Sequence, residues 1–109
     1  KSLVSDPKIN VGVANVTFEP ACRNNWHIHH DGFQLLLVTG GEGWYQEDGH
    51  SPRFLTAGDV VITHDGVEHW HGATADSWFE HLAITAGSAE WLEPVTDDYY
   101  NELEKITEG

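Results

Sequence analysis

The chain has 109 residues, of which 39% are hydrophobic and 21% charged, a composition typical of a soluble globular domain. Five Lys and Arg residues against 18 Asp and Glu residues give a formal net charge of −13 at pH 7, which disfavours nucleic acid and anionic membranes as partners. The apolar runs are too short to span a bilayer, and the first ten residues lack the apolar stretch of a secretory signal, so we expect one cytoplasmic domain over residues 1–109.

Short strands separated by turn residues are predicted from about residue 11 to about residue 85. In chain order they are "VGVANVTF", "QLLLVT", "GWYQ", "RFL", "VVI", "EHWHG" and "WFEHLAI". The run "VVI" is expected to be buried on both faces, because it lacks the alternation of a half-exposed strand. So many short strands favour an all-β sandwich or barrel, since an open sheet would leave edges prone to aggregation.

A short C-terminal helix is predicted over about residues 96–107. Thr96 is a suitable N-cap, two aspartates follow it in the first turn, and Lys105 lies in the last turn, where each charge complements the helix dipole. Tyr99, Leu103 and Ile106 fall on one face of this helix. We expect that face to cover part of the barrel.

Nitrogen and oxygen donors gather on the predicted strands. His27 and His29 share one face of a strand, about 7 Å apart at the backbone, and His69 and His71 repeat the pattern later in the chain. Gln34 shares a face with apolar residues, so its amide needs a polar partner to offset the cost of burial. A metal ion would be such a partner, although a single His-x-His pair also occurs on solvated strands.

The spacing of these residues resembles the two cupin motifs. The first motif is matched by His27, His29, Gln34 and Gly41, and the second by Gly58, Gly66 and His69. The resemblance implies a small antiparallel cupin β-barrel, related to the jelly roll. It also implies an internal metal site formed by His27, His29, Gln34 and His69.

A narrower likeness is carried by "VTFEPACRNNWHIHH", "HWHGA" and "HLAI". These segments resemble small bacterial cupins akin to manganese-dependent hydroxynitrile lyases and to the cupin partners of carboxymuconolactone decarboxylases. By position, the resemblance implies that His71 and His81 act on the substrate. The sequence departs from the pattern at Ala21, which replaces a glycine, at His64, which replaces a proline, and at Thr85, which replaces a glutamine that helps the substrate in those lyases.

The expected function is therefore metal-dependent chemistry on a small oxygenated organic molecule, of lyase, decarboxylase or isomerase type. Four neutral ligands would leave one divalent transition metal ion per chain with its full charge and with open coordination positions. The resemblance favours manganese, while imidazole and amide ligands also suit iron, nickel, cobalt or zinc. A metal-dependent dioxygenase and a non-catalytic metal- or metabolite-binding cupin are the alternatives.

Several other residues carry weaker expectations. Trp26 and Trp70 point outward on the strands that carry the histidines, which favours a homodimer with that sheet face buried between subunits. His30 and His50 are expected on the surface, His64 in a structural turn, and Cys22 as a small buried hydrophobe.

Overall fold

The computed structural model describes residues 2–4, 6, 8 and 10–108, without the side chains of Val4 and of residues 106–108. The described elements are β1 (Ser2–Val4), β2 (Gly12–Phe18), β3 (His27–Glu47), β4 (Arg53–Thr56), β5 (Val60–Thr63), β6 (His69–Ala73), β7 (Phe79–Trp91) and α1 (Asp97–Glu108). The predicted all-β fold with a C-terminal helix is confirmed, and the helix begins one residue after its predicted N-cap.

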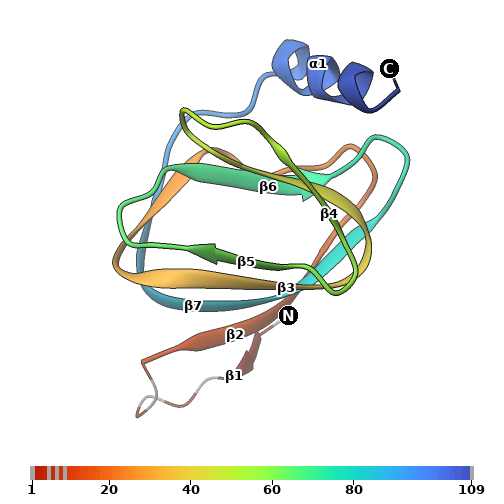
Figure 1. Cartoon of the computed structure of the whole chain (residues 1–109). Helices are drawn as coiled ribbons and strands as arrows, with labels where there is room; N and C mark the ends of the chain where they lie inside the picture. Colours follow the sequence, from red (N-terminus) through yellow and green to blue (C-terminus); the bar gives the residue numbers. More distant parts are fainter. Residues whose placement is uncertain (1, 5, 7, 9, 109) are drawn as a thin grey trace.

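Strand β3 organises the barrel. Its first half pairs with β7 on one side and β5 on the other, and its second half pairs with β4 and β6. Strand β2 continues the sheet beyond β7, and β1 pairs with β2. Because β3 is 21 residues long and curves strongly, its partners surround a common interior (Figure 1).

The apolar core fills one end of that interior. It consists of inward-facing side chains from the strands β3 to β7: Leu36, Val38, Tyr45, Leu55, Val61, Ala73, Phe79 and Ala83. Val16 and Phe18 of β2 pack against this cluster and are partly buried. The other end of the interior is polar and forms the candidate site.

Helix α1 packs on the outside of the barrel, on the side of β6 (Figure 1). The Thr96 hydroxyl accepts a hydrogen bond from the Tyr99 backbone N–H at 3.3 Å, which confirms the predicted N-cap. Among the described side chains of this helix, Tyr100 and Leu103 are buried, whereas Tyr99 is 38% exposed. The predicted contact of Ile106 lies outside the described side chains. Among the described residues, no helix is long and apolar enough to cross a membrane.

The helix changes the interpretation of the outward-facing tryptophans. Trp70 is fully buried in a second cluster with Trp44, Tyr100 and Leu103, and Trp26 packs against that cluster. The prediction that Trp70 is buried against another subunit is therefore wrong, because the chain's own C-terminal helix covers it. The homodimer itself stays a prediction that needs a different surface.

Two positions with positive φ, Ala21 in a turn and Gly41 within β3, explain why the cupin pattern has glycine there. Ala21 has φ 67°, in the left-handed region that disfavours a side chain. Gly41 has φ 72°, and a Cβ atom added to it would lie 1.7 Å from the Trp78 carbonyl oxygen. The chain therefore tolerates backbone strain at Ala21, whereas close contact enforces glycine at position 41.

Candidate metal centre

Buried polar side chains cluster at the polar end of the barrel interior. Each is at most 7% exposed, and each points inward from a strand that alternates between two faces. They are His27, His29 and Gln34 from β3, His69 and His71 from β6, and His81 from β7.

Gln34 joins the histidines only because β3 is irregular. Strict alternation from His29 would place Gln34 on the opposite face, since five residues separate them. The β3–β7 register shifts between His30 and Phe33, and Asp31 in this stretch has φ 60°. A bulge of this kind changes the phase of the strand by one residue, which turns the Gln34 amide toward the imidazoles.

The imidazoles of the two His-x-His pairs lie close together. The ring centroids of His27 and His69 are 4.1 Å apart, and the His29 centroid is 5.1 Å from the first and 5.2 Å from the second. The Gln34 Oε1 atom is 3.1 Å from His69 Nε2. The four residues that resemble cupin metal ligands are thus neighbours at one point of the interior.

Backbone carbonyls define the tautomers of two of these rings. His27 Nδ1–H donates to the Asn25 carbonyl at 2.8 Å, and His69 Nδ1–H donates to the Val67 carbonyl at 3.0 Å. In each neutral ring the proton is then on Nδ1, and Nε2 keeps its lone pair. This is the form in which an imidazole binds a metal ion.

The Gln34 amide is oriented in the same sense. Its Nε2–H donates to the Thr85 hydroxyl at 3.2 Å, so its Oε1 faces the lone pair of His69 Nε2. Two acceptors at 3.1 Å repel each other unless a cation or a proton lies between them. Both ring nitrogens of His29 are also buried without a hydrogen-bond partner. This donor set fits a metal ion.

A compact group of three buried histidines shares His27 and His69 with the predicted ligand set. Ligand atoms of His27, His69 and His71 all lie within 4.8 Å of one another, so these three buried histidines can hold a metal ion. His71 is thus close enough to His27 and His69 to be a ligand, whereas the predicted set completes the site with His29 and Gln34 instead. The assignment of individual ligands therefore depends on the hydrogen bonds of each ring.

His71 and His81 form a second pair beside the first. Their ring centroids are 5.0 Å apart, and the Phe18 ring lies next to both, 5.7 Å from the His71 centroid and 6.0 Å from the His81 centroid. His71 Nε2 accepts a hydrogen bond from the Asn24 amide at 3.1 Å, and its Nδ1 is buried without a partner. Both nitrogens of His81 are also buried without a partner.

Burial keeps all five imidazoles neutral at pH 7. Loss of hydration lowers the pKa of His27 and of His29, lowers that of His69 to about 3 and that of His81 to about 4. The pKa of His71 is lowered well below its usual value, first by burial and then by repulsion from the neighbouring imidazoles. Lone pairs for metal binding or proton transfer are therefore available at neutral pH.

A cavity of about 430 Å³ opens onto this cluster. Its polar wall includes His27, His29, His71 and His81, and its apolar wall includes Val16, Phe18 and Ala83. Trp91 is 60% exposed at the edge of the cavity, and its ring centroid is 4.6 Å from that of His27. A small molecule can therefore reach the histidines from solvent.

The sequence analysis missed Asn24 and Trp91. Asn24 precedes β3 and has no periodic pattern that could identify it. Trp91 ends β7, where "EWLEP" could be read as a loop. Thr85 was noticed only as a departure from the family pattern, and its contact with Gln34 needs a structure to be seen.

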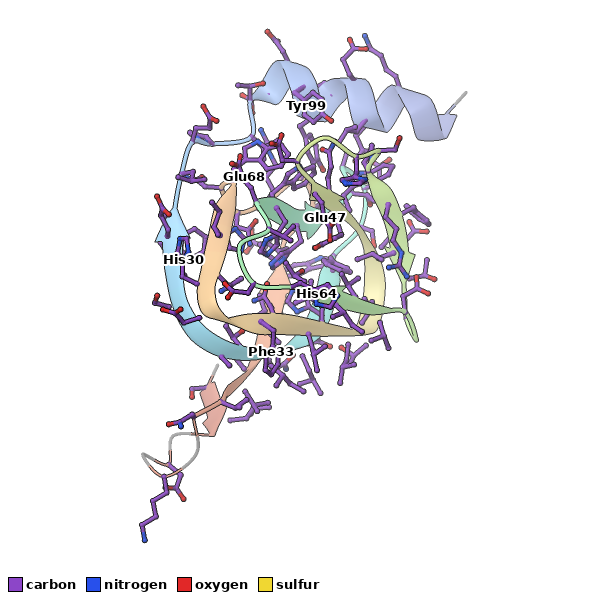
Figure 2. All side chains as sticks on the ribbon, turned by 60° about the vertical axis from the view of Figure 1, so that its left-hand side comes forward. His30, Phe33, Glu47, His64, Glu68 and Tyr99 are labelled. Atoms are coloured by element: carbon purple, nitrogen blue, oxygen red, sulfur yellow. The ribbon has the colours of Figure 1, made fainter. Side chains whose placement is uncertain are left out.

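The remaining histidines lie outside the site. His50 is exposed, as expected, and His64 is exposed directly after β5. His30, labelled in Figure 2, is partly exposed, and its Nε2 lies 2.7 Å from a carboxylate oxygen of Glu90. The expectation that Cys22 is buried is wrong: the thiol is exposed, because the turn at Ala21 carries it to the surface.

Comparison with known proteins identifies the family. Residues 14–85 match the model of the cupin domain, so the chain belongs to the cupin family. It is 43% identical over 99 residues to (R)-mandelonitrile lyase of Granulicella tundricola, a match that covers 87% of this chain and 74% of that protein.

Solved structures agree with this assignment. A cupin-like protein of Thermotoga maritima superposes with a TM-score of 0.88 at 44% identity, over 94% of this chain and 80% of the other. A DMSP lyase of Ruegeria pomeroyi has a TM-score of 0.68 at 22% identity, over 81% of this chain and 46% of that one, and shows the fold alone.

Proposed function

We propose that this chain is a metal-dependent cupin enzyme that cleaves a small oxygenated molecule, in the manner of a hydroxynitrile lyase. The proposal is supported by the buried histidine cluster, by the cavity that reaches it and by the likeness to a mandelonitrile lyase. One divalent transition ion per chain, manganese by resemblance, would be held by His27, His29, Gln34 and His69.

A single observation carries the proposal. Gln34 Oε1 and His69 Nε2 face each other at 3.1 Å, and the other end of each group is already committed as a donor. Neither group can supply the hydrogen that would make this contact favourable at neutral pH. A bound cation would make it favourable, and when bound it would supply Lewis-acid polarisation of a substrate oxygen.

His81 and His71 are suited to different roles in such a cleavage. His81 is neutral at pH 7 and can accept the hydroxyl proton of a cyanohydrin. As the carbon–carbon bond breaks, its electron pair leaves with cyanide, and His71 Nδ1–H can donate a hydrogen bond to the developing anion. The protonated His81 can then give its proton to cyanide, which releases HCN and restores the neutral ring of His81, while His71 keeps its proton throughout; the two ring centroids are 5.0 Å apart.

The apolar wall supports a substrate with a hydrophobic substituent. Val16, Phe18 and Ala83 exclude water from one side of the cavity, while the histidines occupy the other. A hydroxyl or carbonyl directed to the histidines and an apolar group directed to Phe18 would match this division. Mandelonitrile has both groups and is the natural first test.

The first experiment measures metal content. Protein purified without added metal should contain about one equivalent of one transition metal per chain. The Gln34→Leu variant should lose it, whereas His64→Ala, which changes an exposed histidine, should keep it. Absence of metal from wild-type protein, even after soaking with Mn²⁺, would exclude the proposed site.

The second experiment measures turnover of mandelonitrile. His81→Ala and His71→Ala should retain metal but lose about 10²- to 10⁴-fold in kcat, the usual contribution of general acid–base catalysis. Oxygen uptake with phenolic substrates instead would indicate the dioxygenase alternative. Unchanged turnover in His71→Ala, together with lower stability, would indicate a non-catalytic site.

A further inference from the structure

Asn24 makes three hydrogen bonds with His71. The Asn24 backbone N–H donates to the His71 carbonyl at 3.1 Å, the His71 backbone N–H donates to Asn24 Oδ1 at 2.9 Å, and Asn24 Nδ2 lies 3.1 Å from His71 Nε2. Asn24 also lines the cavity that the histidines share. The first two bonds fix the position of the asparagine, and the third reaches the imidazole.

These bonds determine which nitrogen of His71 carries the proton. Because Asn24 Oδ1 accepts from the backbone, its other amide atom must be the NH₂ group, which can only donate. His71 Nε2 must therefore accept, and the proton of the neutral ring is on Nδ1. That Nδ1–H is buried and has no hydrogen-bond partner among the residues that the structure describes.

We propose that Asn24 is a positioning residue that holds His71 as an Nδ1–H donor toward the substrate and keeps it out of the metal's ligand set. The proposal deepens the proposed function and rests on it for its catalytic consequence. It also resolves the overlap between the two candidate ligand sets, because His71 is close enough to His27 and His69 to join them. Its Nε2 lone pair is occupied by Asn24, and its Nδ1 carries a hydrogen.

The same arrangement occurs on the other side of the site. Thr85 orients the Gln34 amide so that oxygen faces His69, and Asn24 orients His71 so that an N–H remains free. Thr85 thus makes Gln34 an acceptor toward the site, and Asn24 makes His71 a donor toward it. Without Asn24, His71 Nε2 would become available to the ion beside His27 and His69.

Asn25 provides a matched control. It has the same side chain in the next position, and its Nδ2 donates to the Leu92 carbonyl at 3.1 Å rather than to a histidine. Asn25→Ala therefore removes one side-chain hydrogen bond of similar length, keeps the backbone carbonyl that accepts from His27 Nδ1–H, and leaves the hydrogen bonds of His71 unchanged. A difference between Asn24 and Asn25 variants cannot then be assigned to the loss of an asparagine alone.

The test is nitrogen NMR of metal-free protein with ¹⁵N-labelled histidine. In the wild type, His71 Nε2 should have the chemical shift of an unprotonated nitrogen and Nδ1 that of a protonated one. Asn24→Asp, which presents an acceptor to the ring, should shift Nε2 to the protonated value, and Asn25→Ala should match the wild type. A wild-type His71 protonated on Nε2 would overturn the proposal without the need for any variant.

Two further measurements separate positioning from a structural role. Asn24→Ala loaded with Co²⁺ should have a visible absorption spectrum altered from that of the wild type, because His71 becomes a ligand, whereas Asn25→Ala should not. With mandelonitrile, kcat of Asn24→Ala should fall about 10- to 100-fold with little change in KM. If the tautomer is as expected but wild-type protein has no turnover, the lyase function fails and the positioning remains. An unchanged Co²⁺ spectrum and kcat in Asn24→Ala contradict the positioning role.

Discussion

The two faces of the strands β3 and β7 depart from the usual distribution of residues in opposite ways. The inner face carries buried histidines, and the outer face carries aliphatic side chains that include Leu35, Leu37, Leu82 and Ile84. Polar groups are normally hydrated, and aliphatic groups are normally covered. We propose that an ion on the inside and a second protein surface on the outside satisfy these two faces.

The largest effect on the inner face is expected when one of the proposed metal ligands is removed. His69→Ala should abolish stoichiometric metal binding, because it deletes both an imidazole and the acceptor opposite Gln34. We expect the affinity for Mn²⁺ to fall by more than about 100-fold, which is the loss that can follow when only a residue hydrogen-bonded to a metal ligand is replaced. Equilibrium dialysis with Mn²⁺ measures it, with the exposed His50→Ala as control; equal affinity in the two variants would remove His69 from the site.

Acid should destabilise the inner face of the metal-free protein. The folded-state pKa values of the buried histidines lie below the unfolded value near ~6.5, so the unfolded state binds more protons and stability falls as pH falls below that value. For His69 and His81, with pKa values of about 3 and about 4, the loss continues down to those values. Between pH 7 and pH 5 each such histidine should remove about 2 kcal/mol of unfolding free energy.

Urea denaturation of metal-free protein at the two pH values measures this effect. His81→Phe, which replaces one buried imidazole with an apolar ring, should have a smaller pH dependence than the wild type by about 2 kcal/mol. Equal slopes in the two proteins would show that His81 is not held neutral by burial.

The apolar outer face can be tested through the oligomeric state of the protein. Val60 and Ile62 of β5 are 49% and 53% exposed, although the sequence predicted a strand buried on both faces. Across the sheet, Ile62 lies opposite Leu35, Leu35 opposite Ile84, and Ile84 opposite Val13; a parallel row joins Val60, Leu37 and Leu82.

We propose a second copy of this chain as the partner of these rows. They contain no charged residue in a chain of net charge −13, and acidic residues such as Asp31 and Glu80 lie at their margins. An apolar centre with a polar rim is the anatomy of a homodimer interface. Phe33 extends the face on the side of the barrel remote from α1 (Figure 2).

Sedimentation equilibrium tests this surface. The wild type should be a dimer at micromolar concentration, and Ile62→Glu should weaken the dimer by at least about 100-fold, because a carboxylate would be buried without a partner. Thr56→Glu, on the exposed part of β4, should leave it unchanged. A monomeric wild type, or a dimer that tolerates Ile62→Glu, would exclude this face.

The smallest expected effect concerns the turn that leads to the site. Ala21→Gly should stabilise the protein by about 1 kcal/mol, because the left-handed conformation is less costly without a Cβ atom. The melting temperature should rise by about 4 °C or more. Ala57→Gly, at an exposed position without a positive φ, should lower it; a rise in both variants would point to another cause.

The parts of the molecule that follow a short period could be predicted from the sequence. Alternation placed His27, His29, His69 and His71 on the inner face, and the Thr96 cap located the helix. Gln34 was placed inside without the register shift that puts it there. Asn24 could not be found, because its role depends on a loop meeting β6, which no local pattern encodes.

The covering of outward-facing residues was predicted least well. A continuous apolar run indicates burial on both faces but does not say what supplies the second layer. For Trp70 that layer is α1 of the same chain, and for Val60 and Ile62 it lies beyond the described residues of one chain. The sequence therefore indicates which apolar side chains must be buried, but it does not indicate as readily which surface buries them.

The central position of β3 has a consequence for how the protein folds. Its partners include β4, which follows directly, and β7, which ends near the C-terminus, so the strand must wait for nearly the whole chain before its pairing is complete. Such high contact order slows folding. The hairpin with β4 can nucleate early, whereas Trp91 opposite His27 is among the last contacts to form, and the histidine-lined interior is completed only when β7 pairs with β3.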